Sequence, residues 1–265
     1  MVRVERPVMA ITGGASGIGY ATATQWIKTG GAVVLMDRDA IGLDAAVKVL
    51  GQYSRAIVTD VTSSESVDAA FDSIADIETR LDAVVACAGN TGPGPSALVS
   101  DKQFQRVTEV HLAGTFRTLR TAHGLLKKAE AGGSIVTISF VAGRVGMPQR
   151  ASYNAVKHGI EGLTKSLAVE WAMDGIRVNS VAPGYVWTPL NQKLESNGQI
   201  DTSTISARIP VGRWAIPEEI AKPIIFLSST AASYINGHTL YVDGGMTIAG
   251  DWYPAKEDAN VPNIL

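Results

Sequence analysis

The stretch Thr12-Gly13-Gly14-Ala15-Ser16-Gly17-Ile18-Gly19 decides the fold, because it joins an apolar run at residues 8–12 to a helical pattern at residues 17–29. Glycine lets a backbone turn tightly and approach a ligand closely. The helix that follows offers free N–H groups and the positive end of its dipole to a diphosphate. Glycines also build simple turns, but the order strand, glycine loop, helix favours dinucleotide binding.

Outward from this loop, short apolar runs alternate with helical patterns. The predicted strands cover residues 8–12, 32–36, 55–58, 81–86, 134–139, 177–182 and 239–242. Helix caps are predicted at Asp39, Thr62 and Ser100, with a long helix at residues 152–173 and a short one after Pro217. A looser segment runs from residue 185 to about 214. This alternation predicts an α/β fold, a doubly wound parallel sheet of Rossmann type, forming a single domain over residues 1–265.

Composition narrows the class of protein. The chain has 265 residues, a formal net charge of -2 and 18% charged residues, which argues against a nucleic-acid or anionic-membrane surface. Residues 1–6 lack a secretory-signal pattern, and no apolar stretch is long enough to span a bilayer. Because Cys87 is the one cysteine, an internal disulfide is excluded and we expect a cytoplasmic protein.

An acidic residue follows the second predicted strand. A carboxylate at Asp37 can accept hydrogen bonds from both hydroxyls of an adenosine ribose, and it repels a 2′-phosphate. This favours NAD over NADP, although Arg38 beside it can meet a 2′-phosphate. Asp60-Val61 closes the third strand, where we expect the adenine, and Ala88-Gly89 follows the fourth, where small residues let the cofactor pack.

Tyr153 and Lys157 lie four positions apart on the long predicted helix, so they share one face. The pair follows the fifth strand, at the sheet edge where ligands bind. An ammonium beside a phenol favours the phenolate, and we therefore expect the pKa of Tyr153 to be lowered towards neutrality. Tyr153 is then a proton donor and acceptor, and Lys157 also holds the nicotinamide ribose.

From residue 10 to about 245 the sequence resembles the short-chain dehydrogenase/reductase family. The resemblance rests on the glycine loop, Asp60-Val61, Ala88-Gly89, Tyr153-Asn154-Ala155-Val156-Lys157, Arg177-Val178-Asn179, Pro183-Gly184 with Thr188, and Val242-Asp243-Gly244-Gly245. It implies an NAD-dependent oxidoreductase in which Tyr153 is the acid/base, Lys157 its electrostatic partner, and Val186 and Thr188 neighbours of the nicotinamide amide. It also suggests a homotetramer, with Ala155, Gly159 and Gly162 allowing close helix packing between subunits.

Two positions depart from the family pattern. His111 stands where the family has an asparagine that helps to seat a water relay to the lysine. Histidine also donates and accepts hydrogen bonds, so it can partly substitute for the asparagine. A surface or packing role for His111 is an equal alternative. Phe140 stands where the family has the serine that polarises the carbonyl, and Ser139 is its neighbour. Three interpretations remain. Ser139 reaches the site after a local shift, or Phe140 shapes an apolar pocket and the enzyme works with Tyr153 alone, or the chain is a laboratory variant or a natural form with weak activity.

The segment at residues 185–215 corresponds to the family's substrate lid. Its polar residues Asn191, Gln192, Lys193, Glu195 and Asn197 favour a polyol or sugar-derived alcohol/carbonyl substrate, with Phe140, Arg144, Arg150 and Trp187 as expected lining residues. In the tail at residues 246–265, Trp252 and Tyr253 are predicted to dock on a neighbouring subunit. The alternative function is a dinucleotide-binding sensor or scaffold that has lost its chemistry at His111 and Phe140.

Overall fold

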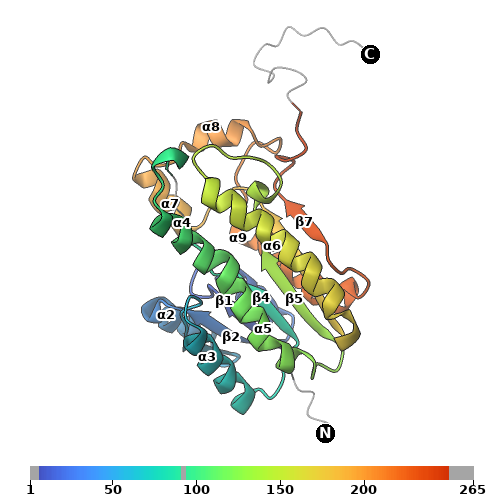
Figure 1. The fold of residues 1–265 in the computed structure, drawn as a ribbon. Coiled ribbons are helices and arrows are strands. Elements are labelled where there is room, and N and C mark those ends of the chain that lie inside the picture. The colour runs from blue at the N-terminus through green and yellow to red at the C-terminus, as the bar shows by residue number, and fades with distance from the viewer. Residues whose placement is uncertain (1–5, 91–93, 251–265) are drawn as a thin grey trace.

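A computed structural model describes residues 6–90 and 94–250 of the chain. Seven parallel strands form one sheet in the order β3-β2-β1-β4-β5-β6-β7 (Figure 1). Their bounds are β1 (Val8–Thr12), β2 (Ala32–Asp37), β3 (Ser54–Val58), β4 (Ala83–Ala86), β5 (Gly133–Ile138), β6 (Ile176–Pro183) and β7 (Thr239–Val242). The order reverses between β1 and β4, and this switch point opens a crevice at the carboxyl ends of both strands. The predicted doubly wound fold is confirmed.

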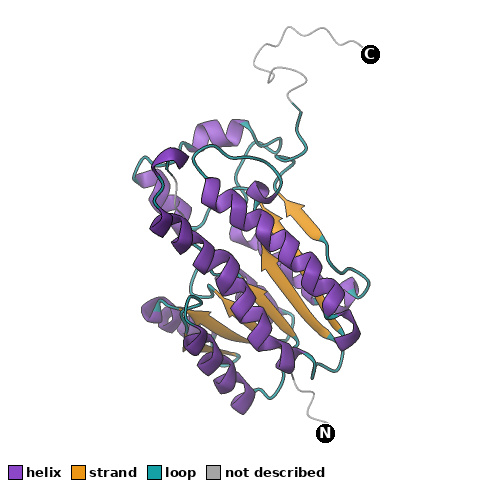
Figure 2. Ribbon diagram, in the orientation of Figure 1, coloured by secondary structure: helices purple, strands orange, loops and turns teal. Residues whose placement is uncertain are grey.

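Helices cover both faces of the sheet, as Figure 2 shows. On one face lie α3 (Ser64–Ile77), α5 (Gly114–Leu126) and α6 (Ala151–Glu170), and on the other α1 (Gly17–Lys28), α2 (Ala40–Leu50) and α9 (Pro217–Ser228). Each face has its own apolar core, the first around Phe71, Leu119 and Leu167 and the second around Trp26, Leu35 and Ile224. Burial on both faces explains why the strands are apolar at successive positions rather than alternating.

The predicted helix caps are correct at two of three positions. Asp39 accepts a hydrogen bond from the Gly42 backbone N–H, and Ser100 forms a reciprocal capping box with Gln103 at the start of α4 (Asp101–Thr108). The cap of α3 is Ser63, so the prediction of Thr62 is wrong by one residue. Thr62 donates instead to Asp60, which fixes the turn after β3.

The helix that begins after Ser100 is not continuous. A π-helical turn, η2 (Glu109–Ala113), separates α4 from α5. Such turns insert an extra residue into a helix and occur often at functional sites. Here the turn contains His111, whose side chain is buried next to the crevice.

The segment after β6 is more ordered than the sequence predicted. It contains two helices, α7 (Pro189–Ser196) and α8 (Thr202–Ala207), beyond the carboxyl ends of the strands (Figure 1). The Thr188 side chain accepts from the Asn191 N–H with proline at the first helical position, and Asp201 caps α8. These capping signals are present in the sequence, and the expectation of a loose segment is wrong.

Short 3-10 turns complete the described chain: η1 (Ser96–Leu98), η3 (Val141–Gly143), η4 (Ala172–Asp174) and η5 (Thr230–Ala232). Across residues 6–90 and 94–250, no helix has the length and apolarity needed to cross a membrane. The predicted docking residues Trp252 and Tyr253 lie outside the described residues.

Candidate active site

The glycine loop after β1 disfavours side chains at three positions. Gly13 and Gly17 have positive φ angles of 69° and 56°, which side chains disfavour. A Cβ on Gly19 would collide with the carbonyl oxygen of Gly13, so Gly19 lets α1 start directly against the loop. Thr12 ties this loop to the end of β4, because its Oγ1 accepts from the backbone N–H groups of Cys87 and Ala88 at 3.2 and 3.3 Å.

A cavity of about 450 Å³ opens between this loop, the ends of β4–β6 and helix α7. Its lining contains most of the residues predicted from the sequence: Gly13, Ser16, Gly17, Ile18, Asp37, Arg38, Ala88, Gly89, His111, Ser139, Phe140, Arg150, Tyr153, Lys157, Pro183, Gly184, Val186 and Thr188. Asp60 and Val61 line a smaller adjoining cavity of about 80 Å³ that shares Asp37 and Arg38 with the first. Gly13, Ala88 and Gly89 line both cavities as well, and the two adjoining cavities together are called the groove.

Three predicted site residues lie elsewhere. Gly19 is packed behind the loop that it shapes. Arg144 places its guanidinium 5.3 Å from the ring centroid of Tyr241, and Trp187 packs edge-on against Trp214. Neither Arg144 nor Trp187 is part of the cavity lining. The lining contains residues that the sequence did not single out: Asn90, Tyr185, Leu190, Leu194 and Ile200.

The Asp37 carboxylate is fixed at the end of β2. Its Oδ2 accepts from the Ala15 N–H at 3.2 Å, and its Oδ1 accepts from the Asp39 N–H at 3.1 Å. The glycine loop and the acid are therefore one rigid unit, with the remaining lone pairs of the carboxylate available to a ligand. This geometry fits a nucleotide whose ribose carries free hydroxyls.

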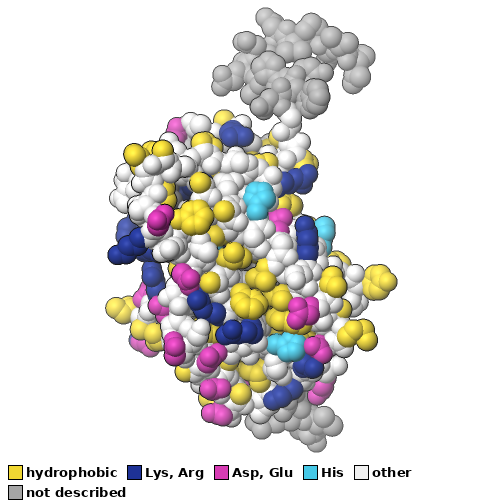
Figure 3. Space-filling view, in the orientation of Figure 1, with side chains coloured by type: hydrophobic (Ala, Val, Ile, Leu, Met, Phe, Trp, Pro, Cys, Tyr) yellow, Lys and Arg dark blue, Asp and Glu magenta, His cyan; other side chains and the backbone are white. Residues whose placement is uncertain are grey.

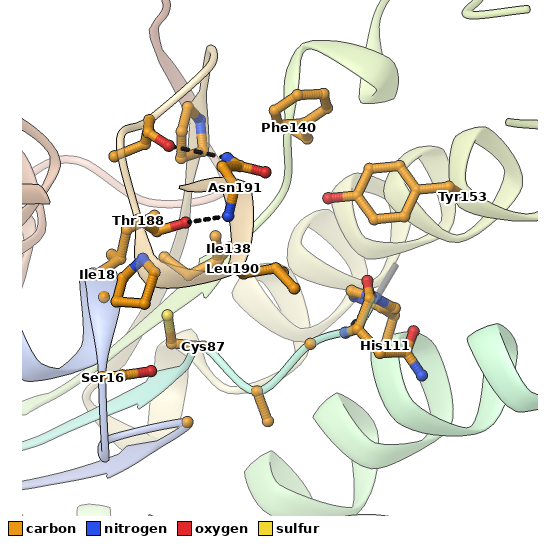
Figure 4. Close-up of a pocket in the computed structure, with 18 of the residues that line it drawn as sticks. Ser16, Ile18, Cys87, His111, Ile138, Phe140, Tyr153, Thr188, Leu190 and Asn191 are labelled. Carbon is orange, nitrogen blue, oxygen red and sulfur yellow. Dashed lines mark hydrogen bonds between the residues drawn. The ribbon is translucent and has the colours of Figure 1, made fainter. Parts of the chain in front are cut away.

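Tyr153 and Lys157 both reach the cavity from the first turns of α6. Figure 4 shows the phenol oxygen of Tyr153 pointing into the space beside Phe140 and Leu190. The Lys157 ammonium lies 5.3 Å from the ring centroid of Tyr153 and donates a hydrogen bond to the Ile138 carbonyl at 2.7 Å. That hydrogen bond anchors the lysine to the end of β5 and holds its charge beside the phenol.

Burial governs the pKa values of this pair. It lowers the pKa of Lys157 from 10.5 to about 8, because the ammonium is almost fully removed from water. Burial likewise raises the pKa of Tyr153 above its ordinary value, with only a partial opposing effect from Arg150. The predicted lowering of the Tyr153 pKa is therefore wrong for the chain without a ligand, because desolvation of the phenolate outweighs nearby positive charge.

His111 lies edge-on to Tyr153, with ring centroids 5.3 Å apart. Its Nε2 lies 3.1 Å from the backbone N and 2.9 Å from the backbone O of Asn90. Burial lowers the pKa of His111 to about 3, with a contribution from the Lys157 charge, so the imidazole is neutral. A Cβ on Gly89 would lie 2.8 Å from the histidine Cε1, which shows that this glycine makes room for the ring.

Comparison with known proteins agrees with this geometry. The family profile described as enoyl-(acyl carrier protein) reductase matches residues 13–247. The chain belongs to the short-chain dehydrogenase/reductase family. Cis-4-hydroxycyclohexanecarboxylate dehydrogenase of Sinomonas cyclohexanicum is 43% identical over 91% of this chain and 96% of its own length. An uncharacterised short-chain type dehydrogenase/reductase of Sinorhizobium fredii is 39% identical over 90% of this chain, which spans 43% of that protein.

Solved structures show the same fold. A 3-ketoacyl-(acyl-carrier-protein) reductase from Brucella melitensis in complex with NADH has a TM-score of 0.85 and 30% identity, covering 92% of this chain and 99% of its own. Levodione reductase has a TM-score of 0.86 and 30% identity, covering 94% and 100%. The chain is thus a member of an oxidoreductase family that binds nicotinamide dinucleotides.

Phe140 stands where the resemblance to the family led us to expect a serine. Its ring packs edge-on against both Tyr153 and Tyr185, each with a centroid distance of 5.6 Å. Ser139 borders the cavity, but its hydroxyl donates to Glu161 at 2.9 Å and lies 3.4 Å from the Lys157 carbonyl oxygen. Of the three interpretations, the structure favours the apolar pocket, because the Ser139 hydroxyl is already bonded to Glu161.

The lid directs apolar side chains towards the cavity. Leu190, Leu194 and Ile200 line it, whereas Gln192 and Lys193 are exposed to solvent. Asn191 does border the cavity, but its amide donates to the Val186 carbonyl at 2.8 Å (Figure 4). The polar composition that suggested a polyol therefore belongs to the outer face of the lid.

Over the described parts of the chain, no group of three or more His, Cys, Asp or Glu side chains is placed to hold a metal ion.

Burial raises the pKa of the Cys87 thiol to about 11, so this cysteine stays protonated and packs as a small apolar residue.

Proposed function

We propose that this chain is an NAD(H)-dependent dehydrogenase/reductase that moves a hydride between nicotinamide and a secondary alcohol/carbonyl pair. The observation that carries the proposal is the Tyr153 phenol and the Lys157 ammonium, side by side at a cavity that begins at the glycine loop. A phenol that faces a dinucleotide groove is suited to exchange a proton with a substrate oxygen.

NAD is the proposed cofactor because Asp37 is held at the ribose end of the groove. We assign the diphosphate to the loop around Ser16 and Gly17, where the start of α1 supplies N–H groups. The remaining assignments follow the groove: Ile18, Ala88 and Gly89 along its floor, Asp60 and Val61 at the adenine, and Pro183, Gly184, Val186 and Thr188 at the nicotinamide. Arg38 lines both cavities and could meet the 2′-phosphate of NADP. The preference for NAD over NADP therefore rests on Asp37.

In this mechanism the bound nicotinamide supplies or accepts the hydride. During carbonyl reduction, Tyr153 donates its phenolic proton to the developing alkoxide, and the Lys157 ammonium stabilises the phenolate that remains. Lys157 can then return a proton near neutral pH, because its pKa of about 8 lies close to that range. Neutral His111 packs against the Tyr153 ring and keeps the phenol oriented.

We propose a compact, largely apolar secondary alcohol or ketone as substrate, in place of a polyol. Leu190, Leu194 and Phe140 give the cavity an apolar wall, and such walls reward the burial of ring or chain carbons. Arg150 contributes a cation at the same cavity, which suits an acidic group on the substrate. One relative is named for its action on cis-4-hydroxycyclohexanecarboxylate, a compound that combines an apolar ring with a carboxylate.

We also propose a cytoplasmic homotetramer. Hydrophobic side chains gather over α5 and α6 on the face shown in Figure 3. Phe104 of α4 and Phe116 of α5 are exposed. In the described part of the chain, no other element lies within 4 Å of the position that a Cβ on Gly162 would take, so this glycine is suited to contact with a second chain. Gly159 instead faces Leu112 of its own chain. Light scattering with sedimentation velocity tests the assembly.

The test of function is turnover. Purified protein is incubated with NAD+ and a panel of alcohols, including cyclohexanol, cis-4-hydroxycyclohexanecarboxylate and threitol, and NADH absorbance is recorded. We expect turnover with the alicyclic alcohols and its loss in Tyr153→Phe, whereas Tyr234→Phe, a change at a fully exposed tyrosine, keeps wild-type activity. NADH binding without turnover across the panel would favour the sensor or scaffold function instead.

A further inference from the structure

The site lacks a side-chain donor where the family serine stands. The Phe140 ring lies between the rings of Tyr153 and Tyr185, 5.6 Å from each. It has no polar atom, so it cannot donate to an oxygen that gains charge during reduction. Removing one such donor typically slows an enzyme about a hundred- to a thousand-fold, so a site without a substitute carries a large cost.

Ser139 is not that substitute. Its hydroxyl donates to Glu161 Oε1, and the same oxygen accepts a hydrogen bond from Tyr241 at 2.8 Å. Ser139 is fully buried in this cluster, with Gly143 packed closely against its hydroxyl. Turning the hydroxyl towards the cavity would break a charge-assisted hydrogen bond in a buried place.

Tyr185 is the other phenol at the cavity. It follows Pro183-Gly184 at the end of β6, and its ring is held between Phe140 and Trp214, whose centroid is 5.0 Å away. Its backbone carbonyl accepts from the Ala215 N–H at 3.0 Å, which fixes the start of the lid. Within residues 6–90 and 94–250, the Tyr185 hydroxyl makes no hydrogen bond, so it is available to a ligand.

We propose that Tyr185 donates a hydrogen bond from its O–H to the substrate carbonyl oxygen, in place of the missing serine. The Phe140 ring, which lies between the two phenol rings, would hold them on either side of that oxygen. This rests on the proposed function. A bound reduced nicotinamide would supply the hydride for the new C–H bond. As the C=O π electrons move to oxygen, Tyr153 gives that oxygen its proton. Tyr185 keeps its own proton throughout, which suits a phenol whose pKa is raised by burial.

The test is a double-mutant cycle of Tyr185→Phe and Phe140→Ser, with kcat for ketone reduction and the NADH Kd as readouts. Tyr185→Phe removes one oxygen and keeps the ring between Phe140 and Trp214. We expect kcat to fall about a hundredfold while the NADH Kd is unchanged. In the Phe140→Ser background the serine supplies a donor, so the same change is expected to cost less than about threefold. Tyr234→Phe is the matched control.

Two results would overturn the inference. One is a Tyr185→Phe enzyme whose kcat stays within threefold of the unsubstituted chain. The other is an equal loss in both backgrounds, which would assign a structural role to the hydroxyl. Either result leaves the proposed function intact, because the unsubstituted chain still turns over; a chain that neither binds NADH nor turns over would refute both. Should Phe140→Ser fail to fold, Tyr185→Phe alone decides.

Discussion

Lys157 is expected to make the stability of this protein depend on pH in a characteristic way. Its pKa is about 8 in the folded chain and near 10.5 when exposed. Between these values the unfolded chain binds one more proton than the folded chain, so the free energy of unfolding rises with pH. The slope is about 1.4 kcal/mol per pH unit for one proton, which gives about 2 kcal/mol between pH 8 and 9.5.

The comparison variant is Lys157→Met, which removes the titrating group. It also leaves the Ile138 carbonyl without its donor, but that cost does not change with pH and shifts the whole curve by a constant amount. Urea unfolding of both chains at pH 7, 8, 9 and 9.5, at one protein concentration and ionic strength, measures the gap. Lys165→Met, at an exposed position on the same helix, is the control and should follow the unsubstituted chain.

The expected result is a stability difference, unsubstituted chain minus Lys157→Met, that is flat below pH 8 and increases by about 2 kcal/mol up to pH 9.5. Parallel curves would show that the folded and unfolded chains bind the same number of protons at this site. In that case the buried environment assigned to the ammonium, and its reduced pKa, would be incorrect. Activity is lost in Lys157→Met under either outcome, so stability and not turnover is the decisive measurement.

Four further predictions concern the groove and its surroundings. Gly19→Ala lowers stability by about 1–3 kcal/mol in urea unfolding, whereas Gly124→Ala, at an open position, does not. Asp37→Asn raises the NADH Kd roughly tenfold or more and lowers the NADPH Kd, measured by nucleotide fluorescence. Phe140→Ser raises kcat by roughly tenfold, and an equal or lower kcat would count against aligning it with the family serine. Truncation before Asp251 raises KM and weakens assembly; no change in either removes the proposed docking of the tail.

The sequence predicted the sheet, and most of the residues it assigned to the cofactor site line one cavity, because both depend on local patterns. A glycine loop between a strand and a helix has few physical uses, and the apolar runs had no alternation, which indicates burial on both faces. The reversal of strand order between β1 and β4 then brings Asp37 and the ends of β4–β6 to one edge. Tyr153 and Lys157 meet because helical spacing of four residues puts them on one face.

What could not be predicted depends on side-chain direction at irregular backbone. The π turn that carries His111 leaves no mark on hydrophobic periodicity, because it adds one residue within a helix of mixed composition. The lid presents its leucines inward and its charged residues outward, and composition alone does not separate the two faces. Arg144 and Trp187 are close to the site in sequence, but each packs on an aromatic ring outside it.

The pKa values show the same limit in energetic form. From the sequence, a lysine one helical turn from a tyrosine implies a phenol made more acidic by positive charge. In the folded chain both groups are buried, and the desolvation that raises the pKa of Tyr153 also lowers that of Lys157. The pair is therefore held as phenol and weakened ammonium, a state ready to give a proton rather than to take one. Alcohol oxidation needs Tyr153 as the phenolate, so it should require a higher pH than ketone reduction in this enzyme. A positive charge bound beside Tyr153 would favour the phenolate and oppose this difference.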